Sequence, residues 1–212
     1  MQSKLKVISC YDDVADNYAA KFRDELSKKH FDRLILKAFA SANRDKGRWV
    51  DFGCGPGQTT NFLYELGINN IIGTDISSGM VNVAKRLFPD LKFETADMLD
   101  LQYSDESFST AVAFYAIVHF EYPQLEQAFR EVHRVLTQKG QFLFSFHVGE
   151  EVIHHNTFLE KSVDITFYFF QTERILKLLK AIGFKVIDVL ERHPYEEVEY
   201  PSRRAYVWVE KG

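Results

Sequence analysis

Three glycines at alternate positions follow an apolar stretch and an aspartate, in the order Trp49-Val-Asp-Phe-Gly-Cys-Gly-Pro-Gly57. Glycine at these positions allows positive φ angles and lets a ligand approach the backbone with no Cβ in the way. Residues 58–66 have the composition of a helix, whose free N–H groups and positive dipole end would face the turn. The arrangement of strand, glycine-rich turn and helix predicts a ligand-binding loop.

The spacing of these glycines separates two classes of ligand. A dinucleotide-binding loop has the pattern Gly-x-Gly-x-x-Gly, in which the third glycine seats the helix on the strand. The position that this pattern requires is Gln58 if the count starts at Gly53, and Thr60 if it starts at Gly55. The spacing therefore disfavours an NAD-dependent oxidoreductase, which is kept as an alternative.

Acidic residues end the next two apolar stretches of the chain. Asp75 comes after a short apolar segment and Asp97 follows another. Ligands of open α/β sheets bind outside the carboxyl ends of the strands, so both acids are expected beside the glycine loop. An acid at the distance of Asp75 can accept both hydroxyls of a ribose. The alternative is a solvated acid that caps a helix or a turn, and the same alternative holds for Asp97.

Strand patterns alternate with helix patterns along most of the chain, which predicts a parallel α/β sheet. The last two strand patterns have no helix between them, so the C-terminal strand should be antiparallel. We therefore predict a doubly wound, mostly parallel seven-stranded sheet in one domain over residues 1–212. Residues 1–42 should form a helical cap, with amphipathic helices over 12–42, and residues 149–170 an irregular insertion on the substrate side. The predicted strands begin near residues 48, 70, 91, 108, 141, 185 and 205, and the main helices follow at 58–66, 80–88, 123–136 and 172–182.

The composition favours a single globular domain: of 212 residues, 46% are hydrophobic and 15% aromatic. No stretch approaches the roughly 18 apolar residues of a membrane span or has the pattern of a signal peptide, so we expect a cytoplasmic protein with no membrane partner. A net charge of −4 argues against nucleic acid as a partner. Cys10, Cys54 and the seven histidines lack metal-site spacing, so no metal is expected. The sequence leaves a monomer and a homodimer both open.

Three motifs and the order of elements resemble a known family. They are Asp51-x-Gly-x-Gly-x-Gly57, Tyr11-Asp-Asp-Val-Ala-Asp-Asn-Tyr18, and His119-Phe followed by a helix with Glu131 and Arg134. Together they resemble the class I S-adenosylmethionine-dependent methyltransferases of the small-molecule type, with a methyltransferase type 11/25-like domain and a Rossmann-like fold. The chain departs from the family pattern at Phe108-Ser109, where Phe-Asp is usual, and at residues 138–141, where Lys-Pro-Gly-Gly is usual.

The resemblance implies S-adenosylmethionine as cofactor, S-adenosylhomocysteine as product and a small molecule as methyl acceptor. It implies that Asp75 binds the ribose, that Asp97 binds the adenine amine and that Asp51 meets the methionine amino group or nearby backbone N–H groups. Tyr11 and Tyr18 would cover the cofactor, although Tyr18 also has the spacing of a core residue. The cofactor-binding residues that we predict are Tyr11, Tyr18, Asp51, Gly53, Cys54, Gly55, Pro56, Gly57, Asp75, Ile76, Met80, Ala96, Asp97, Met98, Phe114 and Tyr115.

His119 is the candidate catalytic residue. It lies just after the fourth predicted strand, and a histidine has a suitable pKa to accept a proton from an acceptor. A sulfonium is already an activated leaving group, so methyl transfer needs mainly positioning and the exclusion of water. The alternative, which we favour, is that His119 only lines the site. Since no catalytic residue is diagnostic of this chemistry, a non-catalytic module that binds S-adenosylmethionine or S-adenosylhomocysteine also stays open.

Overall fold

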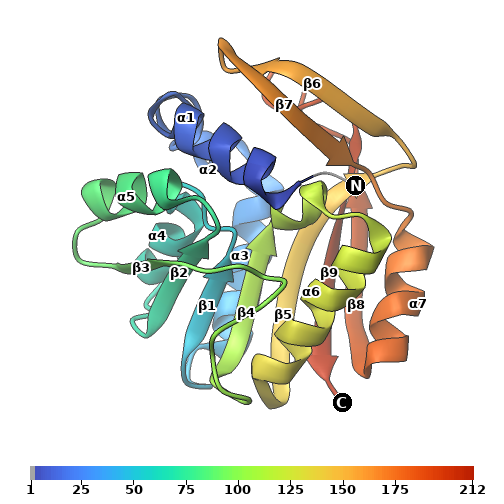
Figure 1. The fold of residues 1–212 in the computed structure, drawn as a ribbon. Helices are drawn as coiled ribbons and strands as arrows, with labels where there is room; N and C mark the ends of the chain where they lie inside the picture. Colours follow the sequence, from blue (N-terminus) through green and yellow to red (C-terminus); the bar gives the residue numbers. More distant parts are fainter. Residues whose placement is uncertain (1–2) are drawn as a thin grey trace.

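A computed structural model describes residues 3–212, which build one large sheet flanked by helices (Figure 1). The strands of this sheet are β1 (Trp49–Phe52), β2 (Ile71–Asp75), β3 (Lys92–Thr95), β4 (Phe108–Phe114), β5 (Leu136–Val148), β8 (Phe184–Arg192) and β9 (Arg203–Lys211). Their order across the sheet is β3-β2-β1-β4-β5-β9-β8. Strands β1 to β5 are parallel, and β9 is antiparallel to both β5 and β8. The predicted seven-stranded, mostly parallel sheet with an antiparallel C-terminal strand is confirmed.

Helices cover both faces of the sheet, as expected of a doubly wound fold. The helices are α1 (Lys4–Phe22), α2 (Glu25–Lys28), α3 (His30–Asn43), α4 (Gln58–Glu65), α5 (Ser78–Leu87), the 3₁₀ helix η1 (Ala116–His119), α6 (Tyr122–Val135) and α7 (Thr172–Ile182). Helices α3 and α4 pack on one face around Phe39, Trp49 and Leu143. Helices α6 and α7 pack on the other face around Phe129 and Phe142. These two apolar layers fix the sheet on which the candidate site is built.

Local signals in the sequence set several helix ends. Ser77 caps α5 by accepting a hydrogen bond from the backbone N–H of Met80 at 3.0 Å. A capping box and a proline in the first turn begin α6. Gly183, with φ of +113°, ends α7. The predicted helical region 12–42 instead begins at Lys4 and is divided into α1, α2 and α3.

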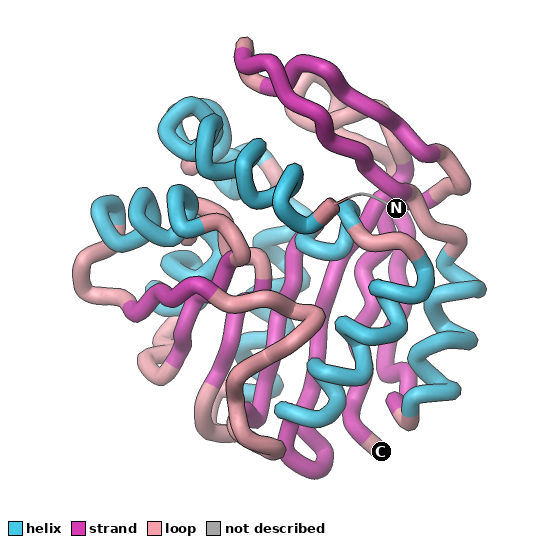
Figure 2. The backbone as a smooth tube through the Cα atoms, in the orientation of Figure 1, coloured by secondary structure: helices cyan, strands magenta, loops and turns pink. Residues whose placement is uncertain are grey.

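The prediction of irregular structure over residues 149–170 is wrong. This segment forms an antiparallel hairpin of β6 (Val152–Phe158) and β7 (Lys161–Tyr168), separate from the main sheet (Figure 2). Strand β7 has the alternation that marks a strand, with Val163, Ile165 and Phe167 between polar residues, but β6 lacks it, because residues 154–157 are all polar. A register shift between His155 and Thr157 interrupts the alternation further.

The carboxyl ends of the parallel strands form the edge of the sheet above which α1 and the hairpin lie (Figure 1). Strand β1 stands between β2 and β4, so the connections after β1 and β4 run to opposite faces and leave a crevice between them. Helix α1 contacts α5 and β7 and lies over this crevice. None of the helices in residues 3–212 is long and apolar enough to cross a membrane.

Candidate functional site

The glycine loop follows β1 and adopts the backbone that its sequence predicts. Gly53, Gly55 and Gly57 have φ angles of +64°, +53° and +89°. A Cβ on Gly53 would lie 2.4 Å from the Cβ of Ala116, so no side chain fits there. A Cβ on Gly55 would meet no atom within 4 Å, because Gly55 borders an open cleft. The loop therefore presents bare backbone to the cleft and leaves room for a ligand.

Asp51, in β1, lies just before this loop and is buried. The residue is 1% exposed, and its carboxylate accepts a hydrogen bond from the hydroxyl of Thr60, on α4, at 2.7 Å. Burial raises the pKa of Asp51 to about 7, against the opposing effect of the Thr60 hydrogen bond. Asp51 does not line the cleft. The donor that a buried Asp51 requires is thus a hydroxyl of the protein itself.

Asp75 is at the end of β2 and lines the cleft. Its Oδ2 accepts a hydrogen bond from the backbone N–H of Gly55, and its Oδ1 accepts one from Ser77, both at 2.9 Å. Burial raises the pKa of Asp75 to about 6, although the two backbone hydrogen bonds favour its ionised form. A carboxylate that is both desolvated and beside the glycine loop is well placed to accept ligand hydroxyls.

A second carboxylate, Asp97, also lines the cleft and follows β3. Its Oδ1 accepts the backbone N–H of Leu99, and its Oδ2 pairs with the Nζ of Lys4 at 2.9 Å. Ile76 and Met80 line the cleft as well. Lys4 was not predicted, because its partner is 93 residues away in the sequence and only the packing of α1 brings the two together.

Tyr11 and Tyr18 of α1 and His119 of η1 line the cleft as well. The hydroxyl of Tyr11 lies 2.7 Å from Nε2 of His119, and Nδ1 of His119 lies 2.9 Å from the backbone carbonyl oxygen of Thr166 in the hairpin. A carbonyl oxygen can only accept, so Nδ1 carries the proton and Nε2 accepts the proton of Tyr11. Burial lowers the pKa of His119 to about 4, which keeps the ring neutral. His119 therefore connects α1, η1 and the hairpin.

The cleft encloses about 1000 Å³ of empty space, including its open mouth. Thirteen predicted site residues line it: Tyr11, Tyr18, Gly53, Gly55, Asp75, Ile76, Met80, Ala96, Asp97, Met98, Phe114, Tyr115 and His119. Four lie outside the lining: Asp51, Cys54, Pro56 and Gly57. Six lining residues were not predicted: Lys4, Val7, Leu99, Ala116, Phe120 and Gln124. Val7 occupies the position four residues before Tyr11 on α1, a helical spacing that could have indicated it.

Neither cysteines nor acids form a metal site in the described part of the chain. No group of three or more His, Cys, Asp or Glu side chains within residues 3–212 is placed to hold a metal ion. Cys10 and Cys54 are buried free thiols, and burial raises the pKa of both.

Comparisons with known proteins point to one family. A family model described as "Methyltransferase domain" matches residues 50–140, which include the glycine loop, Asp75 and Asp97. The chain is 30% identical over 145 residues to an uncharacterized protein of Methanocaldococcus jannaschii, which covers 68% of this chain. The chain spans about half (53%) of that relative. It is 28% identical over 193 residues to an uncharacterized methyltransferase of Oceanobacillus iheyensis, covering 86% of this chain and 81% of the relative.

A solved structure extends the similarity in fold to the whole chain. Magnesium protoporphyrin IX methyltransferase from Synechocystis, crystallised with bound S-adenosylmethionine, is 16% identical, with a TM-score of 0.75 over 100% of this chain and 98% of that one. Residues 50–140 thus match the methyltransferase-domain family, and the chain shares the fold of solved S-adenosylmethionine-dependent methyltransferases. These similarities confirm the resemblance and count against the NAD alternative.

Proposed function

We propose that this chain transfers the methyl group of S-adenosylmethionine to a small-molecule acceptor by direct displacement. The observation that carries the proposal is the hydrogen bond at 2.9 Å from the N–H of Gly55 to the carboxylate of Asp75, at the mouth of an open cleft. This hydrogen bond places the bare backbone of Gly55 next to a desolvated carboxylate, at the end of the sheet where α/β proteins bind nucleotides.

The residues of the cleft fit a nucleoside with a methionine tail. Asp75 would accept the ribose hydroxyls, Ile76 and Met80 would pack against the adenine, and Asp97 would accept the adenine amine once Lys4 releases it. The space that Gly55 leaves open allows the tail to pass close to the backbone. When bound, S-adenosylmethionine supplies a methyl group on a positively charged sulfur, which needs no further activation.

The acceptor would bind between the N-terminal helices of residues 1–42 and the hairpin region of residues 149–170, within a single domain of 212 residues. Contact between α1 and β7 supports this placement, because it brings the two segments together above the carboxyl ends of the parallel strands (Figure 1). An acceptor held between them would be fixed in line with the methyl group and shielded from water, which favours displacement.

The geometry around His119 favours a lining role over that of a base. Its Nε2 already accepts the hydrogen bond of Tyr11, and its low pKa makes it a weak proton acceptor. If the acceptor carries a proton, the one route that the contacts offer is indirect. The oxygen of Tyr11 would take that proton while Tyr11 passes its own to Nε2 of His119.

Calorimetry with S-adenosylhomocysteine and NAD tests the cofactor, and a labelled methyl donor tests turnover. We expect S-adenosylhomocysteine to bind in the micromolar range, about −8 kcal/mol, and NAD not to compete. Binding of NAD without binding of S-adenosylhomocysteine would overturn the proposal. A non-catalytic binding module is the second candidate, since the fold requires no diagnostic catalytic residue. It predicts S-adenosylhomocysteine binding with no labelled product from any class of acceptor.

A further inference from the structure

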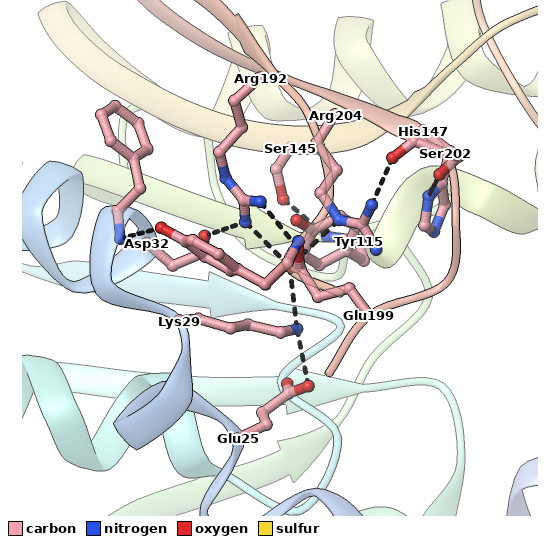
Figure 3. Close-up of polar contacts among 12 residues, drawn as sticks. Glu25, Lys29, Asp32, Tyr115, Ser145, His147, Arg192, Glu199, Ser202 and Arg204 are labelled. Carbon is pink, nitrogen blue, oxygen red and sulfur yellow. Dashed lines mark hydrogen bonds and ion pairs between the residues drawn. The ribbon is translucent and has the colours of Figure 1, made fainter. Parts of the chain in front are cut away.

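A cluster of buried and half-buried charges lies beside Tyr115 (Figure 3). Its cations are Lys29, Arg192 and Arg204, and its acids are Glu25, Asp32 and Glu199. Arg204 is 2% exposed and Asp32 is 1% exposed. Removing ionised groups from water costs several kcal/mol of desolvation free energy for each ion, so each buried charge in the cluster must be compensated by a partner.

All three cations converge on Glu199. Arg192 donates two hydrogen bonds to its carboxylate, at 2.7 and 2.8 Å. Nε of Arg204 lies 3.1 Å from it and Nζ of Lys29 lies 3.9 Å from it. Glu199 comes from the loop between β8 and β9, where the neighbouring Glu196 and Glu197 are exposed, yet its own side chain is fully buried. One acid of a surface loop is thus inserted into a cationic site.

Two of the cations keep an acidic partner without Glu199. Lys29 pairs with Glu25 at 2.7 Å, and Arg192 pairs with Asp32 at 2.7 Å. Arg204 has no second acid among the described residues: its other bond goes to the backbone carbonyl of Ser202. Its buried Nε lies beside Glu199 without the geometry of a hydrogen bond. If Glu199 left, one uncompensated positive charge would remain, and it would be that of Arg204.

The cluster adjoins the cofactor cleft. Tyr115 follows β4 with φ of +56°, and it lines the cleft. Nζ of Lys29 lies 5.1 Å from the centre of the Tyr115 ring, and the guanidinium carbon of Arg204 lies 6.0 Å from it. Tyr115 therefore both lines the cleft and lies beside two of the cations that pair with Glu199, at the carboxyl end of β4, where ligands of such sheets bind.

We propose that the methyl acceptor carries a carboxylate and that this carboxylate takes the place of Glu199 on Arg204. Glu199 is then a resident substitute that keeps the cationic site compensated while no acceptor is bound. The planar guanidinium of Arg204 would bind the incoming carboxylate in a bidentate manner, while Glu25 and Asp32 hold the other two cations in place. This inference rests on the proposed function, because the acceptor is defined only for a methyltransferase.

The test compares two probes that differ in charge but hardly in shape, benzoate and benzamide, on the full chain saturated with S-adenosylhomocysteine. Calorimetry at constant ionic strength should show benzoate binding at least about tenfold more tightly than benzamide. Arg204→Met should abolish this preference. Arg203→Met is the matched control, since Arg203 is the neighbouring residue on β9, is half-exposed and pairs with Glu191. It should leave the preference unchanged.

Glu199→Gln tests directly whether a ligand carboxylate replaces Glu199 on Arg204, because the variant removes the competing charge and keeps the shape of the side chain. It should tighten benzoate binding by about fivefold or more, whereas Glu196→Gln, in the exposed part of the same loop, should not. Benzoate should also speed amide hydrogen exchange over residues 193–202 of the wild-type protein, which a purely structural Glu199 would not allow.

Three results would overturn the inference: equal binding of both probes, a preference that survives in Arg204→Met, or no gain in Glu199→Gln. If Arg204→Met does not fold, Glu199→Gln and the exchange measurement decide. Failure of S-adenosylhomocysteine to bind in the first step would instead overturn the proposed function. Binding of S-adenosylhomocysteine with no preference for benzoate removes only the inference about the acceptor.

Discussion

Asp75→Asn should weaken cofactor binding without weakening the fold. Burial raises the pKa of Asp75 from 3.8 to about 6, and this difference corresponds to about 3 kcal/mol of unfavourable ionisation at neutral pH in the free protein. Asparagine removes that cost. It also weakens the hydrogen bonds from Gly55 and Ser77, each of which contributes roughly 1 kcal/mol. We expect the variant to be as stable as the wild type or about 1 kcal/mol more stable.

Binding should change in the opposite direction. A carboxylate can accept two ribose hydroxyls with charge assistance, whereas an amide keeps a single oxygen and adds a donor. We expect the affinity for S-adenosylhomocysteine to fall by about 2–3 kcal/mol, or roughly 30- to 150-fold.

Protonation of Asp75 should make both the stability of the free protein and its affinity for the ligand depend on pH, in opposite directions. The folded pKa of Asp75 is raised, so its contribution to the stability of the free protein is present at low pH and declines as the pH rises from 3.8 to about 6. A ligand that binds ionised Asp75 must displace a proton below pH 6. The affinity of the wild type should therefore fall about tenfold for each pH unit below 6. The variant should lack both dependences.

Calorimetry with S-adenosylhomocysteine at pH 5, 6 and 7.5, together with urea unfolding of the free protein, measures these effects. Asp90→Asn is the matched control, because Asp90 is an exposed acid in the turn before β3. If Asp75→Asn binds within threefold of the wild type and unfolds more readily, Asp75 is a structural residue and the assignment of the ribose acid is wrong.

Three further substitutions test the glycine loop, the attachment of α1 over the cleft, and His119. Gly53→Ala should abolish S-adenosylhomocysteine binding in calorimetry and lower the melting temperature, because the new Cβ would lie 2.4 Å from the Cβ of Ala116. Asp12→Ala should weaken binding by about tenfold while the sheet stays folded, since Asp12 on α1 accepts the hydroxyl of Ser77 at 2.6 Å and the N–H of Gly79 at 2.7 Å; circular dichroism checks the fold. His119→Ala should lower affinity and turnover together. A loss of turnover of roughly 10²–10⁴-fold at unchanged affinity, with a flattened acidic limb of the pH profile, would identify His119 as a general base.

The parts of the fold that were predicted correctly are those whose signals lie within a few residues. The glycine loop and the acid at the end of β2 each depend on a short stretch of sequence. Asp75 ends β2 and Gly55 lies in the loop directly after the neighbouring parallel strand β1, so the alternation of strands and helices was enough to bring them together.

The parts that were missed depend on contacts between distant segments. Lys4 and Asp97 are 93 residues apart, and Asp12 and Ser77 are 65 apart. No pattern in either segment marks such a contact. The hairpin of β6 and β7 was missed for a different reason. Strand β7 has an apolar face of Val163, Ile165 and Phe167, but its partner β6 has four consecutive polar residues at 154–157, so the two strands do not share the alternation from which a hairpin is recognised.

Contacts between distant segments also determine how α1 is attached over the cleft. Helix α1 is joined to the loop after β2 through Asp12, to η1 through Tyr11 and to the loop after β3 through Lys4. The contacts of Asp12 are short and partly buried, whereas the side chain of Lys4 is 52% exposed and its ion pair with Asp97 is a surface pair worth at most about 1 kcal/mol. Asp97 is also the acid that the adenine amine would need. Opening of the cleft should therefore begin at the N-terminal end of α1, where a ligand replaces the surface pair of Lys4 and Asp97 with a bond of its own.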